Sequence, residues 1–308
     1  MNKEQFKKAI KLGVSISAMT LAFGVIGEVR VDSDITINKS IELKGDMGYE
    51  YKIVFEEKLI SQRISELQYE IIPGMNVTYE GNKYAINVDK VNEMLNETYE
   101  GNEKYIFLTF DDGPSPNTEK VLDILKEKDV HATFFVLGQR VSSSEQSKEI
   151  LRRTIKNGHA IGNHSYTHSL EKLYPSNSID VEYFMEEVNR TSRALKEVLG
   201  ENFDTKIIRM PGGRNSRAYY NDPSLPAFDD RLKKEGIVNI DWNALNGDAE
   251  GKPYTPTEML EYVKSSSSGV SQVVVLMHDT YGKEKTVQVL PQIIDYFKSN
   301  GYEFKTMK

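Results

Sequence analysis

The stretch YIFLTFDDGPSPNTEKVLDILKEKDVHATFFVL, residues 105–137, decides the fold class. Its two ends are apolar runs, at 105–110 and 132–137, that predict buried strands. Between them a helix is expected to begin at Ser115 or Asn117 and to continue through VLDILKEK. Two strands joined by a helix pair in parallel through a right-handed crossover. The stretch is therefore the first βαβ unit of an α/β protein.

The alternation of strands and helices continues from this unit to the C-terminus. Helices are predicted near 148–156 and 181–199. Further strands are expected at AIGNH, KIIRM, IVNID, VVVLM and YEFKT. Parallel strands that alternate with helices favour a barrel of βα units over an open sheet. We expect this barrel to occupy residues 103–308.

Residues 1–27 have the pattern of an export segment. Four lysines within residues 1–11 precede an apolar run at 12–26, and this polarity is typical of a secretory signal. The run is shorter than the roughly 20 residues of a membrane span, and it ends in a weak cleavage site. A cleaved signal and a retained membrane anchor are therefore equally open, with a buried amphipathic helix as the remaining alternative. We expect a protein that is secreted or anchored at the extracellular face.

Residues 28–102 are polar, with short apolar runs and turn signals at Gly74 and Gly81. They predict a small β-rich or α+β spacer domain, and no group in them suggests chemistry. Asn76 and Asn96 lie in N-x-Thr triplets. Such acceptors matter only in a glycosylating pathway, so we assign them no role.

The composition excludes several classes of function. With 46 acidic and 39 basic side chains the formal net charge is -7. The chain lacks the basic surface that nucleic acids require, so no nucleic acid partner is expected. Cysteine is absent from the sequence, which leaves carboxylates and imidazoles as metal ligands or bases.

Polar groups follow the ends of the predicted strands, where a βα barrel collects its reactive side chains. They are Asp111, Asp112, His164, Arg209, Asp241, Asp248 and His278. Because the ends of parallel strands meet at one mouth, we expect these groups to converge. His131 and His159 precede strands and belong to the opposite end, so we assign them no role.

Asp112, His164 and His168 form a candidate metal site. The two histidines are four residues apart, which places both imidazoles on one face if the segment forms a helical turn. With Asp112 they supply three ligands and leave one open position, the arrangement of a catalytic metal site. A divalent ion there would lower the pKa of a water molecule and polarise a carbonyl oxygen.

Asp111 is a candidate general base. The turn at Gly113 and Pro114 allows Asp111 and Asp112 to face the mouth together. One carboxylate then serves as a metal ligand, while the other, beside a cation such as Arg209, suits a base. A solvated turn is the alternative for these residues.

His278 is a candidate proton donor. It follows a wholly apolar strand and has no partner at metal-binding spacing. An imidazole that titrates near pH 7 can pass a proton to a leaving amine when a carboxylate fixes the ring and keeps it charged. Asp248 and Asp279 are the candidates for that carboxylate.

Residues 104–308 resemble polysaccharide deacetylases of the NodB-homology type, the fourth family of carbohydrate esterases. The resemblance rests on five blocks in the family's order, namely TFDDGPS at 109–115, HSYTH at 164–168, RMPGG at 209–213, DWNALNGDA at 241–249 and LMH at 276–278. It implies a distorted (β/α) barrel that removes acetyl groups from a polysaccharide.

The family pattern implies a role for each matching residue. Its metal ligands correspond to Asp112, His164 and His168. In chain order, the other roles are a base at Asp111, an arginine at Arg209 that holds the base, an aspartate at Asp248 that tunes the acid, an acetyl-pocket residue at Leu276 and the acid itself at His278. Acyl transfer also needs oxyanion donors, and backbone N–H groups near Pro114 or Gly212 are the candidates.

Two positions depart from the family pattern. Gly212 and Ala249 stand where many members carry an aromatic residue and a tryptophan, respectively. The surface that receives the sugar therefore differs here. Trp242, or Tyr219 and Tyr220 in an apparent insertion, would supply a sugar-stacking surface instead.

The resulting hypothesis is a metal-dependent deacetylase, acting on an N-acetylated polysaccharide outside the cell. The favoured substrate is N-acetylglucosamine in peptidoglycan, with chitin, poly-N-acetylglucosamine and O-acetylated xylan as alternatives. Muramic acid is disfavoured because the TFDDGPS form differs from the block of muramic-acid deacetylases. One divalent ion is expected, zinc first, with cobalt, nickel and manganese open. We expect a monomer, and a non-catalytic glycan-binding protein is the alternative of a different class.

Overall fold

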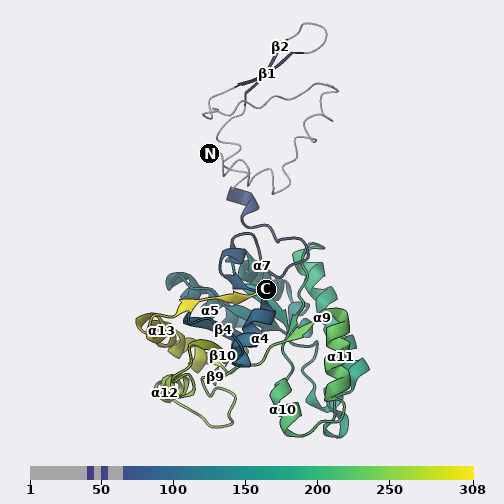
Figure 1. The fold of residues 1–308 in the computed structure, drawn as a ribbon, viewed down its shortest axis with the longest axis vertical. Coiled ribbons are helices and arrows are strands. Elements are labelled where there is room, and N and C mark those ends of the chain that lie inside the picture. The colour runs from purple at the N-terminus through teal and green to yellow at the C-terminus, as the bar shows by residue number, and fades with distance from the viewer. Residues whose placement is uncertain (1–39, 45–49, 55–64) are drawn as a thin grey trace. The chain divides into compact units, whose positions relative to one another are not determined.

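The computed structural model describes residues 40–44, 50–54 and 65–308 (Figure 1). The chain divides into two compact units, Met1–Gln68 and Tyr69–Lys308. Within the described ranges, no helix combines the length and the apolar character that crossing a membrane requires.

The first unit contains one pair of described strands. β1 (Ser40–Lys44) and β2 (Glu50–Val54) pair in antiparallel fashion, with Ser40 opposite Val54. The predicted signal or anchor at 1–27 lies outside the described residues.

The second unit is built on a parallel sheet of eight strands. They are β4 (Tyr105–Gly113), β5 (Thr133–Val136), β6 (Ala160–Asn163), β7 (Ile207–Ile208), β8 (Val238–Asn239), β9 (Ala244–Leu245), β10 (Gln272–His278) and β11 (Glu303–Phe304). Their order is β8-β7-β6-β5-β4-β10-β9, and β11 pairs with the start of β4. In the described part of the chain no pairing between β8 and β9 closes the sheet. The predicted α/β barrel is confirmed as a curled, incomplete barrel.

The longer helices cover the outer side of the curled sheet (Figure 1). They are α5 (Pro116–Glu127), α7 (Glu145–Lys156), α9 (Val181–Leu199), α11 (Leu225–Glu235), α12 (Pro256–Ser266) and α13 (Glu284–Ser299). They pack side by side in the order α12, α13, α5, α7, α9 and α11. Shorter elements are η1 (Gly81–Lys83), α6 (Gly138–Val141), α8 (Leu170–Leu173), η2 (Pro175–Asn177) and α10 (Arg214–Tyr219).

Helix α5 begins where the sequence predicts. Ser115 is its N-cap, and the hydroxyl of Ser115 accepts a hydrogen bond from the Asn117 N–H at 3.0 Å. The Ser115 N–H in turn donates to Thr118 Oγ1 at 2.9 Å. This reciprocal capping satisfies N–H groups that the first turn leaves without helical partners.

Strand β4 carries two faces of opposite character. Successive residues of a strand point to opposite sides of a sheet. Ile106, Leu108 and Phe110 are fully buried in the outer core with the helices. Phe107 packs in the inner core, and Asp111 lies further along the same inner face. The polar end of this inner face becomes the site described below.

Residues 69–102 pack within the second unit, although the sequence assigns them to a spacer. Helix α4 (Val88–Leu95) contributes its apolar residues to the inner core that contains Phe107. Strand β3 (Ala85–Ile86) pairs in parallel with β12 (Thr306–Met307). The compact unit therefore begins before the predicted boundary, because this short polar segment supplies apolar residues that the inner face of the sheet needs.

Asn76 ties that segment to two distant parts of the chain. Its buried Nδ2 donates to the carbonyl oxygens of Ile161, at 3.2 Å, and Met307, at 3.0 Å. The Ile161 N–H donates back to the Asn76 carbonyl oxygen at 3.3 Å. One side chain thus joins the segment to β6 and β12.

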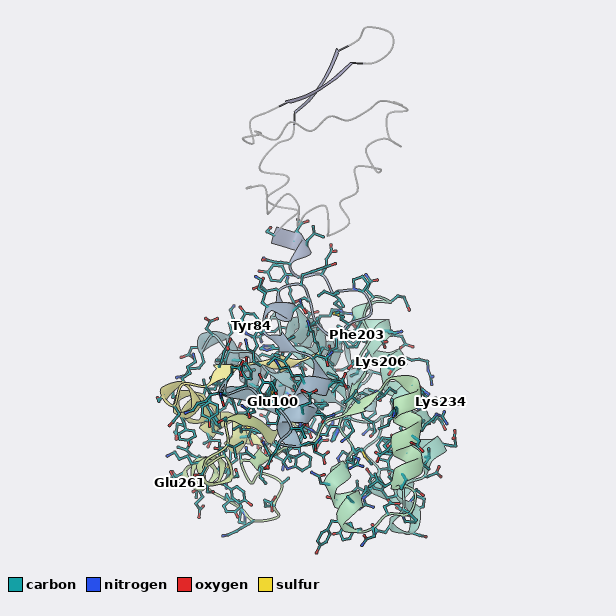
Figure 2. All side chains as sticks on the ribbon, in the orientation of Figure 1. Tyr84, Glu100, Phe203, Lys206, Lys234 and Glu261 are labelled. Carbon is teal, nitrogen blue, oxygen red and sulfur yellow. The ribbon has the colours of Figure 1, made fainter. Side chains whose placement is uncertain are left out.

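His131 and His159, which have no assigned role, lie at the end of the unit where the parallel strands begin. Tyr84 and Lys206, which directly precede β3 and β7, lie toward this end (Figure 2). The Tyr84 ring stacks on His131 with centroids 3.7 Å apart. His159 accepts a hydrogen bond from the Ala132 N–H, and burial lowers its pKa to about 3. His159 is therefore neutral at pH 7 and serves packing.

Replacing Asn76 with alanine is expected to destabilise the second unit by about 2 kcal/mol, because two buried carbonyl oxygens lose a donor. For a unit of this size the melting temperature should fall by about 4–8 °C. Thermal unfolding followed by circular dichroism measures the shift. The exposed Asn96, changed to alanine, is the control and should move stability by less than about 0.5 kcal/mol. Equal shifts in the two variants would contradict the integration of residues 69–102.

Candidate active site

A bulge at the end of β4 turns Asp112 toward the mouth of the barrel. The pairing of β4 with β5 shifts register between Asp111 and Gly113. Asp112 has a φ of 71°, which few residues other than glycine adopt. Gly113 is needed beside it, since a Cβ there would lie 2.8 Å from the carboxylate of Asp279. The bulge thus brings Asp111 and Asp112 to the same side of the strand end.

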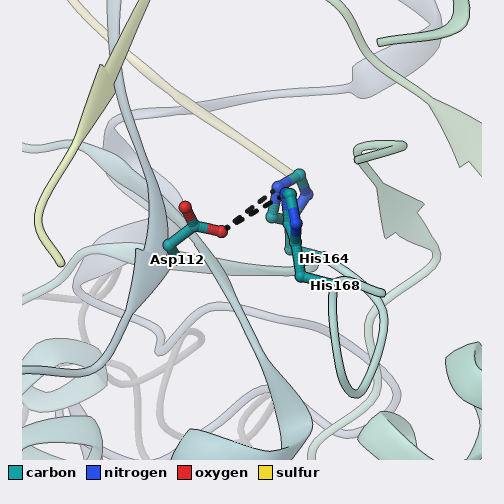
Figure 3. Close-up of side chains that lie close together, drawn as sticks. All are labelled: Asp112, His164 and His168. Carbon is teal, nitrogen blue, oxygen red and sulfur yellow. Dashed lines mark ion pairs between the residues drawn. The ribbon is translucent and has the colours of Figure 1, made fainter. Parts of the chain in front are cut away.

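Asp112, His164 and His168 converge on one point (Figure 3). Asp112 Oδ1 lies 3.6 Å from His164 Nε2 and 3.7 Å from His168 Nε2. These separations are too long for hydrogen bonds, but they are close to the about 3.4 Å that separates two ligands of one tetrahedral zinc ion. Asp112 Oδ1 is also buried without a hydrogen-bond partner. The three residues therefore fit a divalent metal ion.

The protonation states in this cluster also suit metal binding. His164 Nδ1 lies 2.7 Å from the carbonyl oxygen of Arg209, so Nδ1 donates its proton there and Nε2 keeps its lone pair. Burial lowers the pKa of His164 despite the nearby Asp111 and Asp112. Burial raises the pKa of Asp112, but the charges of His164, His168, His278 and Arg140 together outweigh it and lower the value. The cluster combines a neutral imidazole with an ionised carboxylate, as metal ligation requires.

A loop, not a helical turn, brings the two histidines together. Ser165 and His168 have φ values of 67° and 59°, so the helical turn expected from the four-residue spacing is absent. Asn163 Oδ1 accepts from the Ser165 N–H at 3.0 Å, and Ser165 Oγ accepts from the His168 N–H at 3.1 Å. These side chains satisfy backbone groups that a helix would satisfy by itself.

Glu187 of α9 fixes the middle of this loop. Its side chain is fully buried, and Oε2 accepts hydrogen bonds from the N–H groups of Tyr166 at 3.0 Å and Thr167 at 2.6 Å. The Thr167 hydroxyl adds a third at 3.0 Å, and Tyr183 donates its hydroxyl to Oε1 at 3.1 Å. The motifs do not single out Glu187. The sequence signals Glu187 only in that a charged residue stands on the largely apolar face of a long predicted helix.

Asp111 is paired with the buried Arg209. Arg209 Nη1 donates to Asp111 Oδ1 at 2.9 Å and to Thr109 Oγ1 at 2.6 Å. Its other nitrogens donate to the carbonyl oxygens of Ile240, at 3.0 Å, and Asp241, at 3.2 Å. With Oδ1 held in this way, Asp111 Oδ2 faces Asp112, His164 and His168, which we call the metal-ligand cluster.

His278 is fixed and charged by Asp248, and not by Asp279. Its Nδ1 lies 2.7 Å from Asp248 Oδ1, and its backbone N–H donates to Oδ2 at 2.8 Å. Thr286 donates a further hydrogen bond to Asp248 Oδ2 at 2.7 Å. Burial lowers the pKa of His278, but the hydrogen bond and the charge of Asp248 outweigh it and raise the value to about 9. The imidazole is therefore protonated at pH 7.

Asp279 belongs to the support of the DDGP turn. Its Oδ2 accepts from the Thr118 hydroxyl at 2.6 Å, and its N–H donates to the Asp111 carbonyl oxygen at 3.3 Å. Burial raises the pKa of Asp279 to about 7. Asp279 thus links β10 to α5 and to the end of β4.

The residues predicted to contact the substrate lie near the same strand ends. Leu276 shares a face of β10 with His278 and is nearly fully buried. Trp242 packs against Gly213, where a Cβ would lie 2.8 Å from the indole ring. A Cβ on Gly212 would meet open space.

Asp241 positions the insertion that contains the two adjacent tyrosines. Its carboxylate accepts from the backbone N–H groups of Arg214, at 3.1 Å, and Asn215, at 2.7 Å, at the start of α10. Tyr219, the last residue of α10, and Tyr220, its C-cap, are both exposed. Asp241 therefore acts on the shape of the mouth rather than on the metal-ligand cluster.

The combined arrangement can hydrolyse an amide or an ester. Three side chains that could hold a metal ion, a carboxylate fixed by a buried arginine and a protonated imidazole lie at the ends of β4, β6 and β10. Such a set activates water and protonates a leaving group.

Comparison with known proteins points to one family. The family model for polysaccharide deacetylase matches residues 98–225. A peptidoglycan-N-acetylglucosamine deacetylase of Bacillus cereus is 32% identical over 209 residues, which cover 67% of this chain and 87% of that protein. The peptidoglycan-N-acetylmuramic acid deacetylase PdaC of Bacillus subtilis is 39% identical over 220 residues, which cover 68% of this chain but only 39% of PdaC.

A solved structure agrees with these sequence comparisons. A carbohydrate esterase family 4 enzyme of Streptococcus mutans is similar to this chain with a TM-score of 0.71 and 40% identity. The match covers 78% of this chain and 99% of the esterase.

Replacing Glu187 with leucine is expected to weaken the affinity for Zn²⁺ by about tenfold or more, because the loop between the two histidines loses its acceptor. Glu187→Gln retains an acceptor oxygen and should lose less. Titration of metal-free protein in competition with a chromogenic chelator measures the dissociation constant. The control Tyr183→Phe removes a donor to Glu187 but leaves the loop contacts, so its affinity should change by less than about twofold. Wild-type affinity in Glu187→Leu would refute the positioning role.

Proposed function

Because the chain belongs to the polysaccharide deacetylase family of NodB-type carbohydrate esterases, we propose that it removes acetyl groups from N-acetylglucosamine units of peptidoglycan. The observation that carries this proposal is the Asp112, His164 and His168 cluster beside the Asp111–Arg209 pair. The named activity of the Bacillus cereus relative supports the choice of sugar. The export pattern in residues 1–27 supports action outside the cell, by a secreted or membrane-anchored protein.

Asp112, His164 and His168 would hold one divalent ion, with zinc as the first expectation and cobalt, nickel and manganese as alternatives. When bound, the ion would polarise the acetamide carbonyl and make a water molecule more acidic. The orphan Oδ1 of Asp112 and the lone pair on His164 Nε2 support this ligand set.

Asp111 would accept the proton of the attacking water through Oδ2. Arg209 holds Oδ1 at 2.9 Å, so the carboxylate presents one fixed oxygen to the site. The water oxygen forms a bond to the acetyl carbon, and the C–N bond then breaks. A base placed in this way contributes about 10²-fold to 10⁴-fold to the rate.

His278 would give its proton to the departing nitrogen. The products are acetate and the free amine of the sugar, so atoms and charge balance across the step. Asp248 keeps His278 in the protonated form that this role needs. Leu276 would line the acetyl pocket, Trp242 would contact the sugar, and a backbone N–H near Gly212 would donate to the acetyl oxygen.

The first test is acetate release from peptidoglycan and from chitin oligomers, with and without chelator. We expect release from the peptidoglycan that chelator abolishes and Zn²⁺ restores, and glucosamine rather than muramic acid as the deacetylated sugar. Asp111→Asn should lose at least about a hundredfold in kcat while it still binds zinc. His164→Ala should lose the zinc itself.

Two results would refute parts of this proposal. Release of acetate that resists chelator would refute the metal site. Deacetylation confined to muramic acid would shift the substrate to the sugar named for PdaC.

The pH dependence of kcat/KM tests the proton donor. A general acid acts only while protonated, so activity should fall as pH rises through the pKa of His278, which is about 9. A cation held by Asp112 would lower this value, so the alkaline limb is expected at or below pH 9. Asp248→Asn removes the group that raises the pKa and should move the limb to lower pH. An unmoved limb in Asp248→Asn would contradict the assignment of His278.

A further inference from the structure

Arg140 of α6 carries a guanidinium without an acceptor. It is partly buried, and its Nε is buried with no hydrogen-bond partner. Across residues 65–308 no carboxylate lies within ion-pair distance of it, although its charge acts on Asp112, whereas Arg209 and Arg214 are bound to Asp111 and Asp229. A partly desolvated donor without an acceptor costs free energy. This cost suggests that the acceptor arrives with a ligand.

Helix α6 places Arg140 at the metal-ligand cluster. The N–H of Gly138 donates to the Ser165 carbonyl oxygen at 3.1 Å, and the N–H of Gln139 donates to the Tyr166 carbonyl oxygen at 3.0 Å. The helix is therefore bound directly to the loop that joins the two histidines. These contacts place Arg140 at the mouth of the barrel.

Tyr281 completes a small surface with Arg140. It lies three residues after His278 and is 64% exposed. The guanidinium carbon of Arg140 is 5.0 Å from the centroid of the Tyr281 ring, within the range of a cation–π contact. The pair therefore links the ends of β5 and β10 across the end of β4, which carries Asp112.

We propose that Arg140 and Tyr281 form a subsite for a carboxylate on a sugar next to the one that is deacetylated. The inference rests on the proposed function and narrows its substrate to peptidoglycan strands whose lactyl carboxylates are free of stem peptide. A planar guanidinium binds a carboxylate through two parallel hydrogen bonds, and an exposed aromatic ring offers a stacking surface for a sugar. The formal net charge of -7 repels acidic polymers, and Arg140 supplies a local positive charge at the mouth that opposes this repulsion.

The matched substrates differ only in charge. Glycan strands from peptidoglycan, freed of stem peptides, carry a carboxylate on each lactyl group. The same strands with these carboxylates converted to methylamides are neutral. The measurement is kcat/KM for acetate release from both, using the full-length protein loaded with zinc, and the readout is the acidic-to-neutral ratio. This ratio is independent of the fraction of folded enzyme.

The wild type is expected to prefer the acidic strands, and Arg140→Met should lower the ratio about tenfold. Arg140→Lys keeps the positive charge but loses the planar, two-pronged guanidinium, so it should give an intermediate ratio. Arg193→Met, at an exposed arginine of α9, is the control and should keep the wild-type ratio. Added salt should reduce the preference of the wild type.

Two outcomes would overturn the proposal, and they differ from failure of the proposed function. An unchanged ratio in Arg140→Met overturns the subsite. If the unchanged ratio comes with equal losses on both strands and weaker inhibition by added acetate, Arg140 acts on the acetate product instead. A wild type that prefers neutral strands excludes an acidic substrate. Absence of acetate from either strand would refute the proposed function itself.

Discussion

The buried salt bridge between Arg209 and Asp111 is the contact on which the geometry of the site depends. The guanidinium starts from the end of β7 and reaches Asp111 on β4, while two of its nitrogens bind carbonyl oxygens that follow β8. The backbone carbonyl of Arg209 also accepts the Nδ1 proton of His164. One residue therefore fixes the carboxylate and the tautomer of a metal ligand together. Removing one partner of such a pair costs about 3–5 kcal/mol, whereas apolar replacement of both is often neutral, so geometry rather than stability explains it.

The division of the inner face into an apolar part and a polar part explains where the site lies. At one end, α4 packs against Phe107 and Phe135, and this contact fills the curled sheet. The candidate catalytic groups on the inner face lie at the other end, where the strands finish and Arg209 satisfies Asp111. The segment that contributes α4 precedes the barrel in sequence, so the apparent spacer completes the core that supports the site.

The strand-end residues were predictable because parallel strands finish at one edge, and Asp111, Asp112 and His278 each follow a strongly apolar run. The conformation that brings His164 and His168 together was not predictable from their spacing. It depends on positive φ angles and on acceptors such as Glu187, which lies far away in the chain. Arg140 also carries no motif, because its distinguishing feature is the lack of an acceptor in three dimensions. The unit boundary was misplaced for a related reason, since long-range contacts such as those of Asn76 leave no periodic pattern.

His164 and His278 show how the partner of one ring nitrogen separates two roles of the same residue type. In His164, Nδ1 donates to a neutral carbonyl oxygen, burial dominates, and the lowered pKa leaves Nε2 with a lone pair. In His278, Nδ1 meets the carboxylate of Asp248, whose charge outweighs burial and keeps the ring protonated. A neutral ring is a metal ligand and a charged ring is a proton donor. The partner of Nδ1 in each histidine therefore contributes to its chemistry together with its place at a strand end.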